Sequence, residues 1–299
     1  MIIPEYLKKN DNIGIVAPAR QVSIKDVEEC KKYAEQRGYN VIYGNNLFGK
    51  NNQFSGTDEE RAADLQFFLD NPDIKAIICA RGGYGTVRLL PYLNFNKFIA
   101  KPKWIVGFSD ITVLHSVMSK INISSIHAPM CLNYSDENFD KGSIEKTFDL
   151  LEGKSFEYSF PSNVLNKQGI SRGVLVGGNL SVLYSLRATD YDLDTSDKIL
   201  FFEDIDEYLY HIDRMIMNLR IGGFFNRIRG LIVGEMKDMK DNTIQFGKNA
   251  YEIIAEHVND YEIPVCYGLP AGHGNVNYPL ILGQEVELRV EKECKLSLR

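Results

Sequence analysis

One serine of this 299-residue chain stands at a sharp change of local structure. In "KWIVGFSDITVLH", residues 103–115, a short apolar run predicts a strand, and the residues after Ser109 predict a helix. Gly107 leaves room for a tight corner, which resembles the nucleophile elbow that lifts a serine hydroxyl out of a sheet. The first N–H groups of a helix have no partner inside it, so the amide of Asp110 could stabilise an oxyanion. A plainer interpretation, with Ser109 or Asp110 only capping the helix, fits the local residues at least as well, since Ile111 replaces the second glycine of the hydrolase pattern.

A base and a carboxylate for such a serine are also present. A serine hydroxyl is a weak nucleophile until a base takes its proton, and histidine does this best when a carboxylate fixes its tautomer. His273 lies between two glycines in "LPAGHGNVNYP", and Glu203 lies at the end of a predicted strand in "LFFEDID". We expect the remaining histidines to be packed or surface residues: His115, His127, His211 and His257.

A glycine-rich segment follows another predicted strand. In "ARGGYGTVRLL", residues 80–90, the backbone can approach a ligand closely, and its N–H groups suit a phosphate or the oxyanion of acyl transfer. It is neither GxGxxG nor a Walker loop, and glycines that serve only a tight turn fit as well. Arg81 and Arg88 could hold a substrate carboxylate, although arginines at loop ends commonly form surface ion pairs.

The acidic residues of "LFFEDID" raise the alternative of a metal site. Glu203, Asp204 and Asp206 are close in sequence, but no HExxH motif and no His/Cys set with ligand spacing accompanies them. We therefore expect neither a metal nor a cofactor.

The elements that must position these residues alternate between strand and helix. Apolar runs predict strands at 13–19, 40–44, 74–80, 103–106 and 123–129. A helix capped by Ser23 and ended by Gly38 lies between the first two, and Thr57 with Glu60 forms a capping box for another. Strict alternation predicts a parallel sheet with right-handed crossovers, whose ligands bind beyond the carboxyl ends of the strands.

Two domains are expected. Residues 153–169 are polar and without clear period, which is typical of a linker. Residues 1–152 would form a parallel-sheet α/β domain carrying the serine, and residues 170–299 a more mixed α/β domain carrying Glu203 and His273.

Composition narrows the class of partner. The net charge of −6 is spread along the chain, without a basic stripe interleaved with aromatics, which argues against nucleic acid. No apolar run approaches the roughly 18 residues of a membrane helix, and the opening "MIIPEYLKKNDNIG" lacks the features of a secretory signal. The five cysteines are widely spaced and without a CxxC pair, which favours buried thiols. We expect a cytoplasmic protein that acts on a small molecule.

Taken together, the motifs resemble the LD-carboxypeptidase family of serine peptidases, which includes murein tetrapeptide carboxypeptidases and microcin C immunity peptidases. The resemblance keeps its order over most of the chain, and its segments are "VAPA", "ARGGYGTVRLLPYL", "WIVGFSDITVLH", "HAPM", "GVLVGGNLSVL", "LFFEDIDEYLYHIDRMIMNLR", "GLIVGEM" and "GLPAGHGNVNYPLILGQEVEL".

The resemblance implies a division of roles. It implies a triad of Ser109, Glu203 and His273, at the interface of a flavodoxin-like N-terminal domain and a mixed α/β C-terminal domain. It also implies an oxyanion hole from the backbone of Asp110 and Gly83, and a homodimer. The remaining candidates for substrate contact are Arg81, Tyr84 and Arg88.

The substrate remains a choice between branches. The murein enzymes of the family release terminal D-alanine from tetrapeptides during cell-wall recycling, a cytoplasmic task. The microcin-immunity branch instead cleaves an amide to a nucleotide and uses an aromatic side chain for base stacking. The only tryptophan, Trp104, lies inside the strand before Ser109, which favours the murein branch, although a tyrosine could substitute. A binding protein that keeps the scaffold without catalysis is a third alternative.

Overall fold

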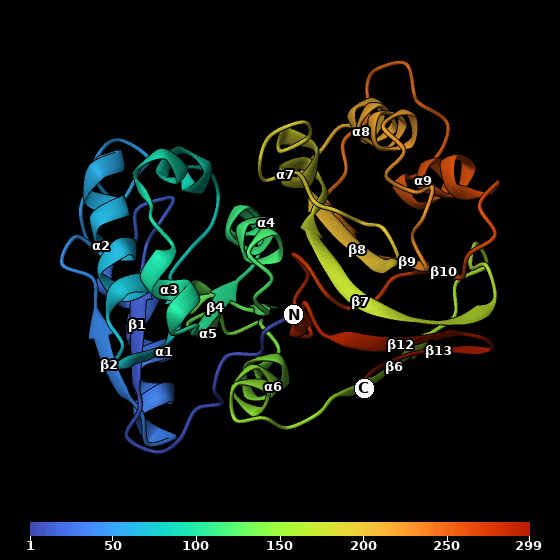
Figure 1. Ribbon diagram of the computed structural model, residues 1–299. Coiled ribbons are helices and arrows are strands. Elements are labelled where there is room, and N and C mark those ends of the chain that lie inside the picture. Colours follow the sequence, from blue (N-terminus) through green and yellow to red (C-terminus); the bar gives the residue numbers. More distant parts are fainter. The chain divides into compact units, whose positions relative to one another are not determined.

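The computed structural model describes residues 1–299, which fold as two compact units. The first unit comprises Met1–Lys154 and Tyr278–Ile281, and the second comprises Ser155–Asn277 and Leu282–Arg299. Each unit is an α/β structure (Figure 1), which confirms the expected fold class.

The first unit is built on a six-stranded sheet in the order β11-β5-β4-β3-β1-β2. Its strands are β1 (Asn12–Val16), β2 (Asn40–Tyr43), β3 (Ile74–Cys79), β4 (Trp104–Gly107), β5 (Ser125–His127) and β11 (Leu280–Leu282). The pairs β1–β2, β1–β3, β3–β4 and β4–β5 are parallel, as the strand and helix alternation predicts. The order 2-1-3-4-5 is that of flavodoxin-like folds, whose ligands bind where the strand order reverses, between β1 and β3.

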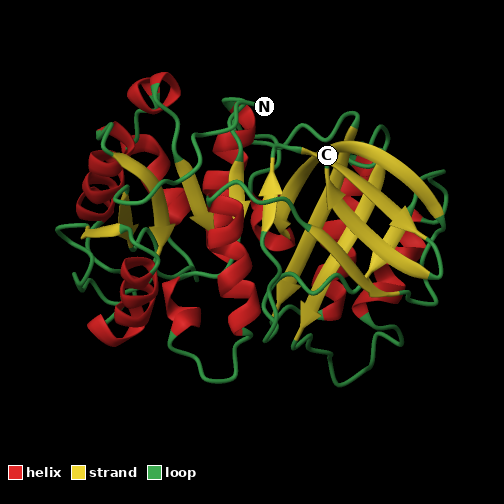
Figure 2. Cartoon of the chain, turned by 90° about the horizontal axis from the view of Figure 1, so that it is seen from below, coloured by secondary structure: helices red, strands yellow, loops and turns green.

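Helices cover both faces of this sheet (Figure 2). They are α1 (Ile24–Gln36), α2 (Asp58–Asp70), the 3-10 helices η1 (Thr86–Tyr92) and η2 (Ser109–Ile111), α3 (Asn96–Ala100), α4 (Thr112–Lys120), α5 (Cys131–Tyr134) and α6 (Lys141–Leu151). Helix α2 begins as predicted, because the Thr57 hydroxyl accepts from the Glu60 N–H at 3.2 Å and the Glu60 carboxylate accepts from the Thr57 N–H at 2.8 Å. Phe68 of α2 packs so closely on β1 that a Cβ at Gly14 would lie 2.8 Å from its ring.

The second unit is built on a seven-stranded mixed sheet in the order β10-β9-β8-β7-β12-β13-β6. Its strands are β6 (Glu157–Pro161), β7 (Gly169–Asn179), β8 (Lys198–Ile205), β9 (Gly230–Lys237), β10 (Val265–Tyr267), β12 (Glu285–Val290) and β13 (Glu293–Leu298). Strands β7 to β10 pair in parallel, while β12 pairs antiparallel with β7 and β13, and β13 with β6. Parallel and antiparallel pairs thus occur in one sheet, which matches the mixed architecture expected for this part of the chain.

Three helices of the second unit, α7 (Leu180–Ser185), α8 (Leu209–Ile221) and α9 (Ala250–Val258), lie on one side of its sheet (Figure 1). Residues 153–169, expected as a linker, contain strand β6. Tyr158 and Phe160 of β6 are buried while their neighbours in the strand are exposed, as in a strand with one covered face. No helix in the chain is long and apolar enough to span a bilayer. All five cysteines are buried thiols, as their spacing predicts.

Candidate active site

Ser109 lies on a strained corner directly after β4. Its backbone φ is +62°, a left-handed conformation that residues with a side chain seldom adopt. Such strain persists only where the surroundings enforce it, and it is typical of a nucleophile elbow. Gly107 permits the corner, because a Cβ there would lie 2.9 Å from Cγ1 of Ile111. Ile111, which takes the place of the second glycine in the hydrolase pattern, therefore packs against the first one.

The glycine-rich segment after β3 lies against this corner. A Cβ at Gly82 would stand 3.2 Å from Cβ of Ser109 and 3.4 Å from the backbone N of Asp110, so only a glycine fits here without displacing its neighbours. The Asp110 carboxylate accepts a hydrogen bond of 2.9 Å from the Thr86 N–H. Asp110 therefore ties the elbow to the glycine segment, instead of only capping its own helix.

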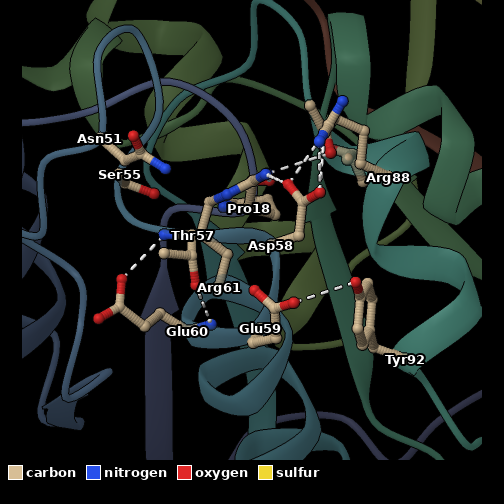
Figure 3. A network of polar contacts seen from close by, with 12 residues as sticks. Pro18, Asn51, Ser55, Thr57, Asp58, Glu59, Glu60, Arg61, Arg88 and Tyr92 are labelled. Atoms are coloured by element: carbon tan, nitrogen blue, oxygen red, sulfur yellow. Dashed lines mark hydrogen bonds and ion pairs between the residues drawn. The ribbon is translucent and has the colours of Figure 1, made fainter.

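A buried arginine fixes the far end of the glycine segment (Figure 3). The guanidinium of Arg61, whose residue is 2% exposed, donates to the carbonyls of Pro18 and Gly85 and to the Asp58 carboxylate. Arg88 binds the same carboxylate, with its Nε 2.9 Å from both oxygens. The segment is thus held at two consecutive residues, Gly85 by Arg61 and Thr86 by Asp110.

His115 supports the elbow from behind. Its Nε2 lies 2.8 Å from the Gly107 carbonyl oxygen, and its Nδ1 lies 2.8 Å from the Ser125 hydroxyl. Burial lowers the pKa of His115 to about 4, so the imidazole is neutral at physiological pH. A neutral ring that donates to the carbonyl must accept from the hydroxyl. His115 is therefore a packed, hydrogen-bonded histidine, as expected from its place on a helix.

Glu203 and His273 meet within the second unit. Nδ1 of His273 lies 2.6 Å from Oε2 of Glu203, a fully buried carboxylate at the end of β8. A carboxylate accepts only, so the Nδ1–H donates to it and the lone pair of the neutral ring lies on Nε2. Burial opposes the charged form of His273, but the charge and hydrogen bond of Glu203 outweigh it and raise the histidine pKa above 6.5.

Glycines on both sides of His273 permit this approach. At Gly272, with φ +131°, a Cβ would lie 2.7 Å from Oε2 of Glu203. At Gly274 a Cβ would overlap the carboxylate of Glu235, to which the Gly274 N–H donates. The sequence "AGHG" is therefore a close-packing motif: it lets the imidazole-bearing loop lie directly on β8 and β9.

The three acidic residues of "LFFEDID", Glu203, Asp204 and Asp206, bind different partners. Asp204 accepts 2.9 Å and 2.8 Å hydrogen bonds from Asn179 Nδ2 and the Ser181 N–H, and burial, with the charge of Glu203, raises its pKa to about 7. Asp206 instead forms an ion pair of 2.7 Å with Lys240. Only Glu203 of the three contacts a histidine in this way. No group of three or more His, Cys, Asp or Glu side chains is arranged to hold a metal ion.

The residues expected to contact substrate lie on or after the glycine segment. Arg88 is engaged by Asp58 (Figure 3), Tyr84 is 46% exposed, and Arg81 is half-buried. Their roles stay predictions. Sequence patterns do not single out Asn179, Glu235, Arg61 or Arg20. Asn179 carried a local signal, since it stands at the cap position of α7 and accepts from the Val182 N–H at 3.2 Å.

Both parts of the chain are similar to known proteins. Residues 13–128 match the LD-carboxypeptidase N-terminal domain, and residues 172–288 match the C-terminal domain of the same family. A Bacillus subtilis protein named "Probable murein peptide carboxypeptidase" is 30% identical over 97% of this chain and 92% of its own.

Two solved structures share the fold. The muramoyltetrapeptide carboxypeptidase from Oxalobacter formigenes superposes with a TM-score of 0.87 at 28% identity, over 96% of this chain and 98% of that one. The microcin C7 self-immunity protein MccF, in its wild-type apo state, gives a TM-score of 0.89 at 21% identity, over 100% of this chain and 98% of its own.

These matches define a class of enzyme, a serine-type peptidase that removes residues from the carboxyl end of peptides. The two domain matches together span most of the chain, which therefore belongs to the LD-carboxypeptidase family. The resemblance seen in its motifs is confirmed.

Proposed function

We propose that this enzyme releases terminal D-alanine from murein tetrapeptides through an acyl-enzyme intermediate, with Ser109 as nucleophile, His273 as base and Glu203 as the carboxylate that orients it. The contact of 2.6 Å between Nδ1 of His273 and the buried Glu203 carboxylate carries this proposal. A base needs its tautomer fixed by a carboxylate. The printed names of the Bacillus and Oxalobacter relatives support a murein peptide as substrate.

The proposed reaction proceeds in two halves. Nε2 of His273 takes the proton of the Ser109 hydroxyl as its oxygen attacks the scissile carbonyl, and the imidazolium then protonates the departing D-alanine nitrogen. Water hydrolyses the ester by the same proton transfers in reverse, which regenerates the serine. The charge of Glu203, which raises the pKa of His273, also stabilises the imidazolium that must form between the two proton transfers.

Two backbone amides are proposed to stabilise the oxyanion. The Asp110 N–H follows the nucleophile on the strained corner, and Gly83, with φ +106°, is next to the residue that packs on Ser109. Each preorganised donor of this kind lowers the barrier by about 3 kcal/mol.

One structural observation favours a murein peptide over a nucleotide amide. Trp104 is fully buried in β4, with its Nε1–H donating to the Glu5 carbonyl at 3.1 Å and its ring stacked on Tyr6. It therefore cannot serve as the exposed platform on which a nucleobase would stack.

A direct assay separates the two branches. The purified protein would be incubated with a murein tetrapeptide and, separately, with an aminoacyl-nucleotide amide, and the products weighed by mass spectrometry. We expect the enzyme to remove one alanine from the tetrapeptide and to leave the aminoacyl-nucleotide amide intact. The Ser109→Ala control should cleave neither substrate. Cleavage of the nucleotide amide alone would replace the murein proposal with the microcin-type activity.

From the family resemblance we also propose that the protein is a homodimer, lies in the cytoplasm and acts in peptidoglycan recycling. Light scattering of the purified protein tests the assembly, with an expected mass twice the 34.0 kDa of one chain. A mass of one chain would remove the dimer from the proposal. Fractionation of the source cell tests the location, with the protein expected in the cytoplasmic fraction and not in the membrane or external fractions.

A further inference from the structure

A carboxypeptidase must recognise the negative charge at the end of its substrate, and an arginine is the side chain best suited to bind a carboxylate. We propose that Arg20 binds the terminal carboxylate of the peptide substrate. The inference rests on the proposed function, and it names a residue for the one substrate group that the triad does not contact.

The fold places Arg20 where a ligand is expected. It follows β1, the strand beside β3, so it lies at the carboxyl edge where the strand order of the sheet reverses. Its backbone N–H is directed at the carbonyl of Gly82, with an N to O distance of 3.5 Å. Gly82 is the residue that packs on Ser109, so this backbone contact links Arg20 to a residue that touches the nucleophile.

The side chain of Arg20 lies along the same segment. A Cβ at Gly83 would stand 2.5 Å from Cδ and 2.7 Å from Nε of Arg20. The arginine therefore lies over the residue whose amide is proposed to hold the oxyanion. The charge of Arg20 also acts on Asp110, the residue after the nucleophile. Burial raises the pKa of Asp110, and the positive charges of Arg61 and Arg20 oppose that rise.

Arg20 differs from the neighbouring arginines in its partners. Arg61 is buried and bound to Asp58, and Arg88 is held by the same carboxylate at 2.6 Å. Arg20 is exposed, and no carboxylate of the chain forms an ion pair with it. Its guanidinium can thus take a carboxylate from outside without breaking an internal pair.

The chemistry of the substrate fits this position. The carboxylate of the last residue is attached to the same carbon as the leaving nitrogen, so it stays close to the scissile bond. In a longer peptide an uncharged amide occupies that place. A cation beside Gly83 would therefore favour removal of the last residue over cleavage within a chain.

The test compares one peptide in two forms, a murein tetrapeptide with its free D-alanine carboxylate and the same peptide as the C-terminal amide. We expect the wild-type enzyme to prefer the acid. Arg20→Gln should lower kcat/KM for the acid by about 10- to 100-fold through a raised KM, the usual effect of losing a charge-assisted hydrogen bond. It should lower kcat/KM for the amide far less than for the acid, and Arg20→Lys should recover part of the preference.

Three further variants sharpen this test. Arg227→Gln, at an exposed arginine of the second unit paired with Asp197 at 3.0 Å, is the matched control and should keep the wild-type preference. Arg81→Gln and Arg88→Gln test whether one of the other two candidate arginines binds the substrate carboxylate instead. An unchanged acid preference in Arg20→Gln, or its loss in Arg81→Gln or Arg88→Gln instead, would overturn the assignment.

A failure of the proposed function would look different. In that case the wild-type enzyme would release neither D-alanine from the acid nor D-alanine amide from the amide, and this inference would fall together with the function. If the wild-type enzyme releases D-alanine and the Arg20→Gln variant keeps the wild-type preference for the acid, the Arg20 assignment is removed and the proposed function stands.

Discussion

The imidazole of His273 donates through Nδ1 to the buried carboxylate of Glu203 over 2.6 Å, and both residues belong to the second unit. The pair is held from several directions. Asn179 donates to the other oxygen of Glu203 at 3.3 Å, and Gly272 removes the side chain that would collide with that carboxylate. The histidine is thereby fixed in one tautomer before any substrate arrives.

The pH dependence of catalysis follows from this pair. Because the base must be neutral, kcat/KM should rise with pH through the pKa of His273, which Glu203 holds above the ordinary 6.5 despite the opposing effect of burial. Glu203→Gln removes the negative charge while burial remains, so the acidic limb should move to lower pH and kcat should fall by about 10⁴-fold. Initial rates between pH 5 and pH 9 measure both, and a limb that stays in place in the variant would contradict the role of Glu203.

Gly82 is predicted to be essential for its lack of a side chain. Gly82→Ala places a methyl group 3.2 Å from Cβ of Ser109, so the corner or the loop must move. Since a displacement of about 1 Å can cost about 100-fold in rate, we expect a loss in kcat of that order. Gly142→Ala, where the new Cβ would also lie 3.2 Å from its nearest atom but against the flexible Asp140 carboxylate, is the control. Equal kcat values for the two variants would refute the prediction.

Arg61 and Arg88 bind one carboxylate but should differ in their contributions to stability. Arg61→Gln leaves Asp58 and two carbonyls without a buried donor and should lower the free energy of unfolding by about 3–5 kcal/mol. Arg88→Gln removes an ion pair whose arginine side chain is 47% exposed, so about 1 kcal/mol or less is expected. Urea titrations measure both, and similar losses would mean that burial does not set the strength of this network.

The proposed mechanism uses only side chains and backbone amides. Dialysis against EDTA should therefore leave the rate of D-alanine release unchanged. Strong inhibition that added divalent metal reverses would return the acidic residues Glu203, Asp204 and Asp206 to consideration as a metal site.

Much of the first unit could be predicted from local patterns. The continuous apolar residues of β3 and the capping box at Thr57 are encoded within a few positions of each other. The tight corner at Ser109 is also encoded locally, by a glycine followed two positions later by a serine at a strand-to-helix change, whereas its left-handed φ of +62° comes from the structure. Such features depend on neighbours in the sequence.

Other features depend on residues far apart in the chain. The hydrogen bond from Thr86 to Asp110 spans 24 positions, and that from Arg61 to Pro18 spans 43. Strand β6 is short and polar on one face, and its partner β13 follows more than a hundred residues later, so its alternation was not distinctive. The location of Arg20 beside Gly83 likewise arises only because β1 and β3 are neighbours in the sheet.

The role of Ser109 as nucleophile is tested most directly by covalent labelling. The enzyme would be treated with a serine-reactive fluorophosphonate, and the modified residue located by peptide mass spectrometry, alongside D-alanine release by the folded Ser109→Ala variant. We predict a single adduct on Ser109 that forms far more slowly in His273→Ala, and no turnover by Ser109→Ala. An adduct on another serine, or near-normal D-alanine release without the Ser109 hydroxyl, would contradict the account.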